Sequence, residues 1–432
     1  MVHICPTEMF SYPIHSSIFE PLTKEFEQQF KDKNERAAQL SICLDGDTFF
    51  DARGNRNAKC TMDLTMVFSC TKVIESLIIA MLVDRKLLDY DMPIATYWPE
   101  FGTTFHSQIT VADLMQHRAG LERIPTRLTT LDACFTFSLL ESKEKWVLET
   151  LQMDEDVKRG ECKTRYHPIT RGIISDILCE RVYGASGAMF VQKEIVAKLP
   201  DIAEFYIGCP NVSIQKRIST CEQAQGMVSA IVELVSHTSG YVRRFKHPGK
   251  RATPEQLDRF HYRHLKPQEV AFTKRVLSSK SREFQSLMIV NDKGFGSHTL
   301  ANAEDFRVIP FLSVTGITNA TSFARILAEL ASDTSTLFLS KEGKRAALEA
   351  DKVGEMDEMI GDPIRYTKCG WSMDYFKPGW IGWAGAGGSV ALFSPTLHAS
   401  FVYIPTKLDS RIHKPHGLRL LDATDKLLRQ GQ

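Results

Sequence analysis

The chain has 432 residues, of which 43% are hydrophobic and 24% are charged, and its formal net charge at pH 7 is +1. These are ordinary globular values, and the length exceeds that of a typical single domain, so two lobes or one large composite domain are expected. The near-neutral charge gives no reason to expect a nucleic-acid partner. No apolar run reaches the roughly 20 residues that span a bilayer, and no stable membrane insertion is expected.

Targeting and cysteine patterns predict a cytoplasmic protein. The first residues lack a charged stretch followed by an apolar core, so no secretory signal is expected. The ten cysteines are scattered, without the C-x-x-C or Cys/His spacing of a zinc site. This usage is typical of reduced thiols rather than a disulfide framework. We therefore expect no metal and no cofactor, while the oligomeric state stays open.

The amino-terminal region predicts a helix followed by a hairpin. Apolar residues recur every fourth position over 18–30, which predicts an amphipathic helix after Ser17. Apolar and polar residues alternate over 40–44, and Asp45-Gly46-Asp47 is a turn sequence. Residues 48–52 then return as the partner strand.

Ser69-Cys70-Thr71-Lys72 opens a predicted helix that is largely apolar to Val83. Positions three apart share a helix face, so the Lys72 amine is expected to reach the Ser69 hydroxyl. The first N–H groups of a helix have no intrahelical partner and carry partial positive charge, so Ser69 could offer its N–H to a developing oxyanion. Partial burial near that positive end would favour the neutral form of Lys72, which can act as a base. A solvated helix start is the alternative interpretation of this short pattern.

Tyr166 directly precedes His167 and Pro168, and proline suits the first turn of a helix. The following segment is rich in isoleucine and ends at Gly184. A tyrosine on the loop entering a buried helix can point its hydroxyl into a cleft. Beside a cationic Lys72, its phenolate form would be favoured, and the two groups would titrate as one unit. The alternative is a core tyrosine with a structural hydrogen bond.

The carboxy-terminal region predicts a second strand pair, over 389–393 and 399–404, and a final helix over 418–428. Strands at both ends of the chain, with a mainly helical body between them, predict an α+β fold. Its antiparallel sheet would be assembled from both terminal regions, with helices on its faces and a helical lobe alongside.

Several stretches together closely resemble the serine β-lactamase and penicillin-binding superfamily, and more narrowly its class C and esterase-like branch, which includes β-lactamase-domain proteins of animals. The resemblance covers nearly the whole chain apart from about 240–300. The stretches that carry it are residues 68–72, 87–93, 97–101, 109–121, 166–168, 206–208 and 385–389.

The resemblance implies a β-lactamase/transpeptidase-like fold and a single catalytic domain over 1–432. Within it we expect a sheet lobe of about 15–68 and 365–432, a helical lobe of about 69–340, and a basic insertion of about 243–282. The resemblance also implies site residues. Ser69 would be the nucleophile, and Tyr166 would exchange protons with the nucleophile and the leaving group, assisted by Lys72. The Ala386 N–H would be the second oxyanion donor beside that of Ser69.

The third motif of this chain departs from the family pattern. Where relatives have Lys-Thr-Gly or His-x-Gly, this chain has Trp383-Ala384-Gly385, and Pro168 replaces the Asn of the Tyr-x-Asn motif. Gly385 keeps the close approach needed at a strand edge that binds substrate. Trp383 carries no charge to hold the carboxylate of a β-lactam, which favours an apolar acyl substrate. A core aromatic residue is the alternative interpretation of Trp383.

Three classes of function follow from these patterns. The first is a serine hydrolase that cleaves a small-molecule ester or small amide through a Ser69 acyl-enzyme. The second is a β-lactamase or peptidase, and the third is a non-catalytic scaffold or filament protein that keeps the fold. We expect His117 to be structural and Cys70 to be buried without attacking substrate. His167 could line the cleft, although a direct neighbour of Tyr166 in sequence usually points elsewhere. The basic segment over 243–275 could steer an anionic substrate or touch anionic lipid, although a solvated insertion fits it better.

Overall fold

The computed structural model describes residues 19–31, 35–55, 63–124, 130–158, 163–199, 203–223, 297–408 and 415–430. The basic segment over 243–275, and the insertion of about 243–282 that contains it, lie outside these described residues.

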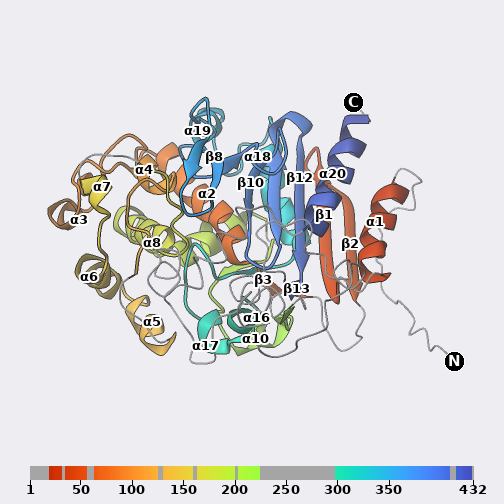
Figure 1. Cartoon of the computed structure of the whole chain (residues 1–432), viewed down its shortest axis with the longest axis horizontal. Helices are drawn as coiled ribbons and strands as arrows, with labels where there is room; N and C mark the ends of the chain where they lie inside the picture. Colours follow the sequence, from red (N-terminus) through yellow and green to blue (C-terminus); the bar gives the residue numbers. More distant parts are fainter. Residues whose placement is uncertain are drawn as a thin grey trace, which may run out of the picture.

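An eight-stranded sheet forms the centre of the molecule (Figure 1). All neighbouring strands whose pairing is described run antiparallel. In spatial order the strands are β2 (Asp47–Asn55), β1 (Ala37–Leu44), β12 (Ala399–Pro405), β11 (Val390–Ser394), β10 (Ile381–Ala384), β9 (Ser372–Met373), β8 (Asp362–Tyr366) and β7 (Glu355–Asp357). The pairing of β1 with β12 joins the two terminal regions, so the predicted hairpins, sheet and fold class are confirmed.

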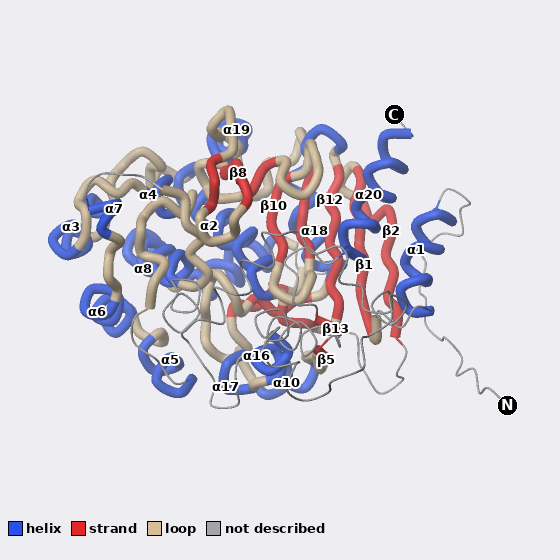
Figure 2. The backbone as a smooth tube through the Cα atoms, viewed as in Figure 1, coloured by secondary structure: helices blue, strands red, loops and turns tan. Residues whose placement is uncertain are grey.

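Two smaller sheets lie beside the helical region (Figure 2). One contains β3 (Thr65–Met66), β6 (Gly316–Thr318) and β4 (Phe205–Ile207). The other pairs β5 (Glu222–Gln223) with β13 (Lys407–Leu408) in parallel. The first of these sheets leads directly into the segment that carries Ser69.

The helices gather mainly on one side of the large sheet, and α1 and α20 lie at its other face (Figure 1). The α-helices are α1 (Glu20–Lys31), α2 (Thr71–Asp84), α3 (Pro99–Thr104), α4 (Val111–Met115), α5 (Thr130–Thr136), α6 (Leu140–Thr150), α7 (Glu155–Lys158), α8 (Thr170–Tyr183), α9 (Gly187–Phe190), α10 (Val212–Arg217), α16 (Ser297–Asn302), α17 (Glu304–Arg307), α18 (Ala320–Ala331), α19 (Lys341–Ala347) and α20 (Pro415–Gln430). None of the helices in the described part of the chain is long and apolar enough to cross a membrane.

Both faces of the central strands β1, β12, β11 and β10 are buried, which explains why β11 and β12 are apolar at successive positions. Leu392 and Phe401 belong to a core with α1 and α20. Their neighbours Ala391 and Val402 belong to the larger core that also contains α2 and α18. Side chains of a strand alternate between faces, so each strand contributes to both cores.

Helix α18 supports the sheet, although the predicted helical lobe of about 69–340 includes its residues. It packs against β1 and β12. The Ser400 hydroxyl donates to the Ala324 carbonyl across 2.7 Å, and the Ala320 N–H donates to the Gln39 side chain across 2.8 Å. The strand β7 also begins before the predicted sheet boundary at 365. The division into lobes therefore stays a prediction.

Two helix starts differ from the sequence expectation. The segment Phe68–Cys70 is a 3-10 turn, and the α-helix proper begins at Thr71. Helix α8 begins at Thr170 rather than at Pro168. At α8, Ile169 is the boundary residue, so Pro168 lies just ahead of the helix. Gly184 ends α8 with a φ of +81°, as the sequence predicts.

Candidate active site

Ser69 lies in the 3-10 turn that leads into α2, and its side chain is half-buried. The preceding Phe68 has a φ of +47°, a conformation that is uncommon for a residue with a side chain. Hydrogen bonds of Thr71 stabilise the turn. Its Oγ1 donates to the Phe68 carbonyl and accepts the Gly316 N–H across 2.9 Å. Val67 N–H also donates to the Gly316 carbonyl. Strand β6 thus fixes the backbone that presents Ser69.

Gly385 places the end of β10 directly against this turn. A Cβ atom at Gly385 would lie 2.2 Å from the Val67 carbonyl oxygen and 2.4 Å from Ser389 Oγ. No larger residue fits without moving backbone. The Gly385 N–H is engaged by the Ser389 carbonyl across 2.8 Å, whereas the next residue, Ala386, is exposed. Gly385 therefore makes the close approach expected of it, and the group it approaches is the Val67 backbone, two residues before Ser69.

Lys72 is buried more deeply than the sequence suggests, with 2% of the residue exposed. Its Nζ donates to the Pro168 carbonyl across 2.6 Å and to the Ser313 carbonyl across 3.1 Å. Among the described residues, these two carbonyls are the hydrogen-bond partners of Nζ. The predicted direct contact between Lys72 and the Ser69 hydroxyl is wrong for this arrangement, because the carbonyls of the Tyr166 loop and of residue 313 hold the amine.

Burial is the main influence on the protonation of Lys72. It lowers the pKa of the amine well below its usual value, Glu75 opposes this effect, and the positive charge of Arg171 adds to it. The expectation of a neutral amine therefore agrees with the environment of Lys72. A neutral amine can accept a proton, which a charged one cannot.

Tyr166 links the candidate residues. Its hydroxyl accepts the Trp383 indole N–H across 3.2 Å, and the Ser69 side chain lies close enough to lower the pKa of that hydroxyl. The Lys72 Nζ lies 4.9 Å from the centre of the Tyr166 ring. The structure thus brings Ser69, Lys72, Tyr166 and Trp383 together.

The expected phenolate form of Tyr166 is wrong. Burial raises the pKa of the Tyr166 hydroxyl, and the nearby Ser69 and Trp383 side chains offset only part of that increase. Burial also disfavours the charged form of Lys72, which weakens the stabilising charge that the sequence suggests. Burial thus acts against the charged form of both groups.

Trp383 sits in an aromatic cluster and is 6% exposed. Its ring centre lies 5.5 Å from that of Tyr166, 5.8 Å from that of Tyr366, and 6.0 Å from those of Tyr375 and Phe376. Both interpretations of Trp383 therefore apply, since it is a core aromatic residue that also donates a hydrogen bond to Tyr166. No side-chain charge enters the site at this position.

Two buried charges behind the site were missed at the sequence level. Glu75 and Arg171 are both fully buried and form a two-pronged ion pair with N···O distances of 3.0 Å. Ser175 and Ser313 donate further hydrogen bonds to Glu75. Glu75 within the otherwise apolar helix α2 was the available signal. A charge in such a position is rarely buried without a partner, so it indicates a buried ion pair. This pair connects α2 to α8.

Asp357 was also missed, and the local sequence offers no signal for it. This carboxylate is fully buried, and it accepts the Tyr166 N–H across 3.1 Å and the Tyr366 hydroxyl across 3.2 Å. Burial raises the pKa of Asp357 to about 6.

His117, His167 and Cys70 have the structural surroundings that the sequence suggests. His117 Nδ1 accepts the His167 N–H across 3.0 Å, and His167 Nε2 accepts the Leu121 N–H across 3.1 Å. The Cys70 thiol is buried against Ser389, and burial raises its pKa to about 12. These three groups hold backbone or fill the core.

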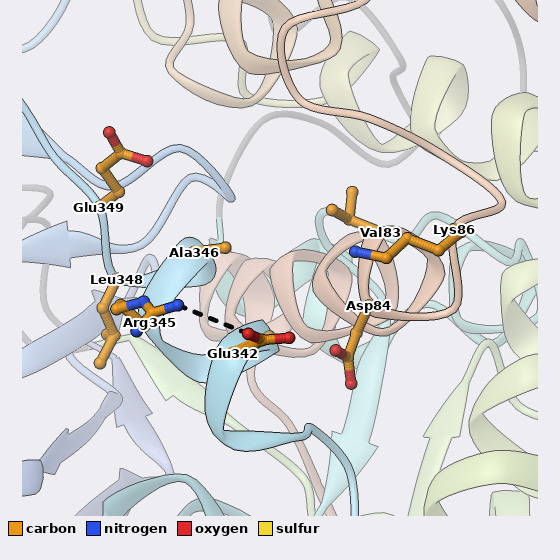
Figure 3. Close-up of a pocket in the computed structure, with 9 residues that line it drawn as sticks. Val83, Asp84, Lys86, Glu342, Arg345, Ala346, Leu348 and Glu349 are labelled. Carbon is orange, nitrogen blue, oxygen red and sulfur yellow. Dashed lines mark ion pairs between the residues drawn. The ribbon is translucent and has the colours of Figure 1, made fainter.

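The described residues also form a surface pocket of about 780 Å³ at the far end of α2. Figure 3 shows its lining, which comes from the end of α2 and from α19. About 20 Å of helix separates this pocket from Ser69, given the rise of an α-helix. Its lining residues are Val83, Asp84, Lys86, Glu342, Gly343, Arg345, Ala346, Leu348 and Glu349. The pocket is therefore separate from the candidate active site.

No group of His, Cys, Asp or Glu in the described part of the chain could hold a metal ion.

Residues 22–424 match the Beta-lactamase family model. The chain belongs to the beta-lactamase family. A curated relative, the esterase/beta-lactamase LipL of Mycobacterium tuberculosis, is 26% identical over 248 residues. The match covers 54% of each chain, so this chain spans about half the length of the curated relative.

Solved structures share the fold of this beta-lactamase family member. A penicillin-binding protein homologue from Caulobacter crescentus has a TM-score of 0.71 and 22% identity, and the match covers 97% of this chain and 100% of that one. A family VIII carboxylesterase has a TM-score of 0.72 and 20% identity, with the same coverage. EstA from Arthrobacter nitroguajacolicus has a TM-score of 0.71 and 21% identity, covering 97% of this chain and 99% of that one.

Proposed function

We propose that this protein is a serine hydrolase that cleaves esters of apolar acyl groups through a covalent acyl-enzyme on Ser69. The observation that carries the proposal is the grouping of three side chains: the Lys72 Nζ lies 4.9 Å from the centre of the Tyr166 ring, and Ser69 lies close enough to the Tyr166 hydroxyl to lower its pKa. Burial lowers the pKa of the Lys72 amine in this grouping. A serine beside a tyrosine hydroxyl and a buried amine fits covalent catalysis, in which a neighbouring base takes the proton of the nucleophile.

In the proposed reaction, Ser69 Oγ forms a bond to the acyl carbon while its proton passes through the Tyr166 hydroxyl towards the neutral Lys72 amine. The bond from the acyl carbon to the alcohol oxygen then breaks, and the alcohol leaves with that proton. Water repeats the sequence in the second half, giving the free acid and restoring Ser69. The N–H groups of Ser69 and Ala386 would bind the oxyanion in both halves.

The proposed substrate class follows from the side chains around the site. Trp383 and the rings beside it offer aromatic surface, and Pro168 has no side-chain amide to bind a polar substituent. The names of relatives agree with this choice, since a curated relative is called an esterase/beta-lactamase and a solved structure is called a family VIII carboxylesterase. An ester is therefore preferred over a β-lactam or peptide.

The decisive experiment is labelling with a fluorophosphonate probe, which reacts with activated serine. The wild-type chain should be labelled, and Ser69→Ala should lose the label and the turnover of a p-nitrophenyl ester. The melting temperature should stay nearly unchanged, because removing one hydroxyl from a half-buried position vacates little packed volume. A Ser69→Ala variant that keeps more than a few per cent of the wild-type rate would exclude Ser69 as the nucleophile. A wild-type chain without any label would favour the scaffold alternative.

A further inference from the structure

The turn between β7 and β8 meets the loop that carries Tyr166 at several points. The Glu358 N–H donates to the Thr164 carbonyl across 3.0 Å, and Arg165 Nε donates to the Glu358 carboxylate across 2.8 Å. The Thr164 hydroxyl donates to the Glu355 carboxylate across 2.9 Å. The loop segment ahead of Tyr166 is therefore attached to this turn.

Asp357 is the buried last residue of β7 and lies at the start of the turn. Its Oδ1 accepts three backbone N–H groups, those of Tyr166, Met359 and Ile360, at 3.0 to 3.1 Å. Two of these hydrogen bonds shape the turn itself, and the third reaches across to the Tyr166 backbone. One oxygen atom thus joins the conformation of the turn to the position of Tyr166.

The second oxygen of Asp357 reaches the other side of the site. Its Oδ2 accepts the Tyr366 hydroxyl across 3.2 Å. The Tyr366 ring packs against Trp383 with ring centres 5.8 Å apart, and against His117 at 5.0 Å. His117 in turn packs against the Tyr166 ring at 4.8 Å. The carboxylate therefore contacts the backbone of Tyr166 directly and the ring of Trp383 through Tyr366.

We propose that Asp357 is a positioning residue that holds Tyr166 and Trp383 in register, so that the Tyr166 hydroxyl stays aligned between Ser69 and the indole N–H. Its catalytic consequence rests on the proposed function. Asp357 does not touch the reacting atoms, and it acts through the backbone of Tyr166 and the ring of Tyr366. An error of about 1 Å in such an alignment can cost a hundredfold in rate.

The test combines one readout of alignment with one of catalysis. The alignment readout is the NMR resonance of the Trp383 indole N–H, assigned by its loss in Trp383→Phe and calibrated by its shift in Tyr166→Phe. The catalytic readout is the rate of fluorophosphonate labelling, together with kcat and KM for a p-nitrophenyl ester. The variants are Asp357→Ala, Asp357→Asn and Tyr366→Phe. The matched control is Glu355→Gln, which alters another carboxylate of β7, one that contacts Thr164 instead of Tyr166.

Asp357→Ala should shift the Trp383 resonance and lower kcat and the labelling rate at least tenfold, with KM changed less than about threefold. Asp357→Asn keeps an oxygen that can accept the three N–H groups and should recover most of the lost rate. Glu355→Gln should leave both readouts at their wild-type values. If Asp357→Ala does not fold, Tyr366→Phe removes only the contact to Oδ2 and should still lower the labelling rate by a few fold.

The proposal fails if folded Asp357→Ala leaves the Trp383 resonance in place, or if both Asp357→Asn and Tyr366→Phe leave the wild-type rate intact while Asp357→Ala does not fold. It also fails if Glu355→Gln matches the effect of Asp357→Ala, because that result would indicate a general loss of the turn. A wild-type chain that takes no label contradicts the proposed function instead. In that case the Trp383 resonance still decides whether Asp357 holds the two aromatic residues.

Discussion

The indole N–H of Trp383 points at the hydroxyl of Tyr166, with 3.2 Å between nitrogen and oxygen. In the family pattern that the sequence resembles, a basic side chain is expected at the position of Trp383. An indole can donate a hydrogen bond but carries no charge. Trp383 can therefore orient Tyr166 and partly stabilise negative charge on its oxygen, while attracting no distant anion.

Trp383→Phe should lower kcat about fivefold, because it removes one hydrogen-bond donor worth about 1 kcal/mol and keeps most of the ring packing. Steady-state kinetics on a p-nitrophenyl ester measure the effect. Trp380→Phe is a suitable control, since Trp380 donates its indole N–H to Asp425, away from Ser69. That variant should lower the melting temperature and leave kcat unchanged. Equal kcat losses in both variants would argue against a specific role for Trp383.

Lys72→Arg should be as inactive as Lys72→Ala. Arginine stays protonated at any accessible pH and cannot accept a proton from Ser69. In the wild type, burial lowers the pKa of Lys72, so the amine is charged below that pKa and neutral above it. Activity should therefore rise with pH through the lowered pKa, and a profile of kcat/KM against pH measures this step. An active arginine variant would show that Lys72 acts only as a charge.

Gly385→Ala should reduce both stability and turnover. The new methyl group would lie 2.2 Å from the Val67 carbonyl oxygen, and such overpacking typically costs about 1–3 kcal/mol. Moving β10 away would also displace Trp383 and Ala386 from Ser69. Urea unfolding and ester hydrolysis measure the two effects.

Gly46→Ala is the matched control for Gly385→Ala, because its Cβ would meet no atom within 4 Å. The φ of +88° at Gly46 makes alanine unfavourable, so some stability is lost there as well. Turnover per folded molecule should nevertheless stay at the wild-type value. If Gly385→Ala also kept full turnover, the close approach to Val67 would not matter for catalysis.

Neutral medium-chain acyl esters should have a kcat/KM at least about a hundredfold above that of any penicillin or cephalosporin. The missing charged anchor and the missing amide contact together correspond to about 3 kcal/mol. Steady-state kinetics on both substrate types at low and high salt measure the ratio. Efficient β-lactam turnover that collapses with salt would contradict this prediction and point to the basic segment over 243–275 as the anchor.

The fold was predictable because its signals are local. The four-residue spacing predicted α1, the Asp45-Gly46-Asp47 turn predicted the first hairpin, and the apolar runs after 389 predicted β11 and β12. The candidate nucleophile and Tyr166 were predictable from motifs. The contacts of the Lys72 amine were not, because Pro168 and Ser313 lie 96 and 241 positions away from it.

The prediction that Tyr166 is a phenolate was wrong for a related reason. The sequence places a lysine near the tyrosine, but how deeply both are buried depends on the packing of α2, α8 and β10 together. Asp357 contacts Tyr166 across 191 positions. Neither fact follows from spacing along the chain.

The pairing of the two terminal regions constrains how this protein folds. The Thr406 hydroxyl donates to the Ala37 carbonyl across 369 positions of sequence, and β1 finds its partner β12 at a similar separation. At typical rates of synthesis, a nascent β1 waits roughly 20–70 s before β12 has been made. During that time the hairpin of β1 and β2 exposes an unpaired edge, which other chains can bind. Such non-local pairing slows folding, so assistance by a chaperone during synthesis should increase the yield of folded protein.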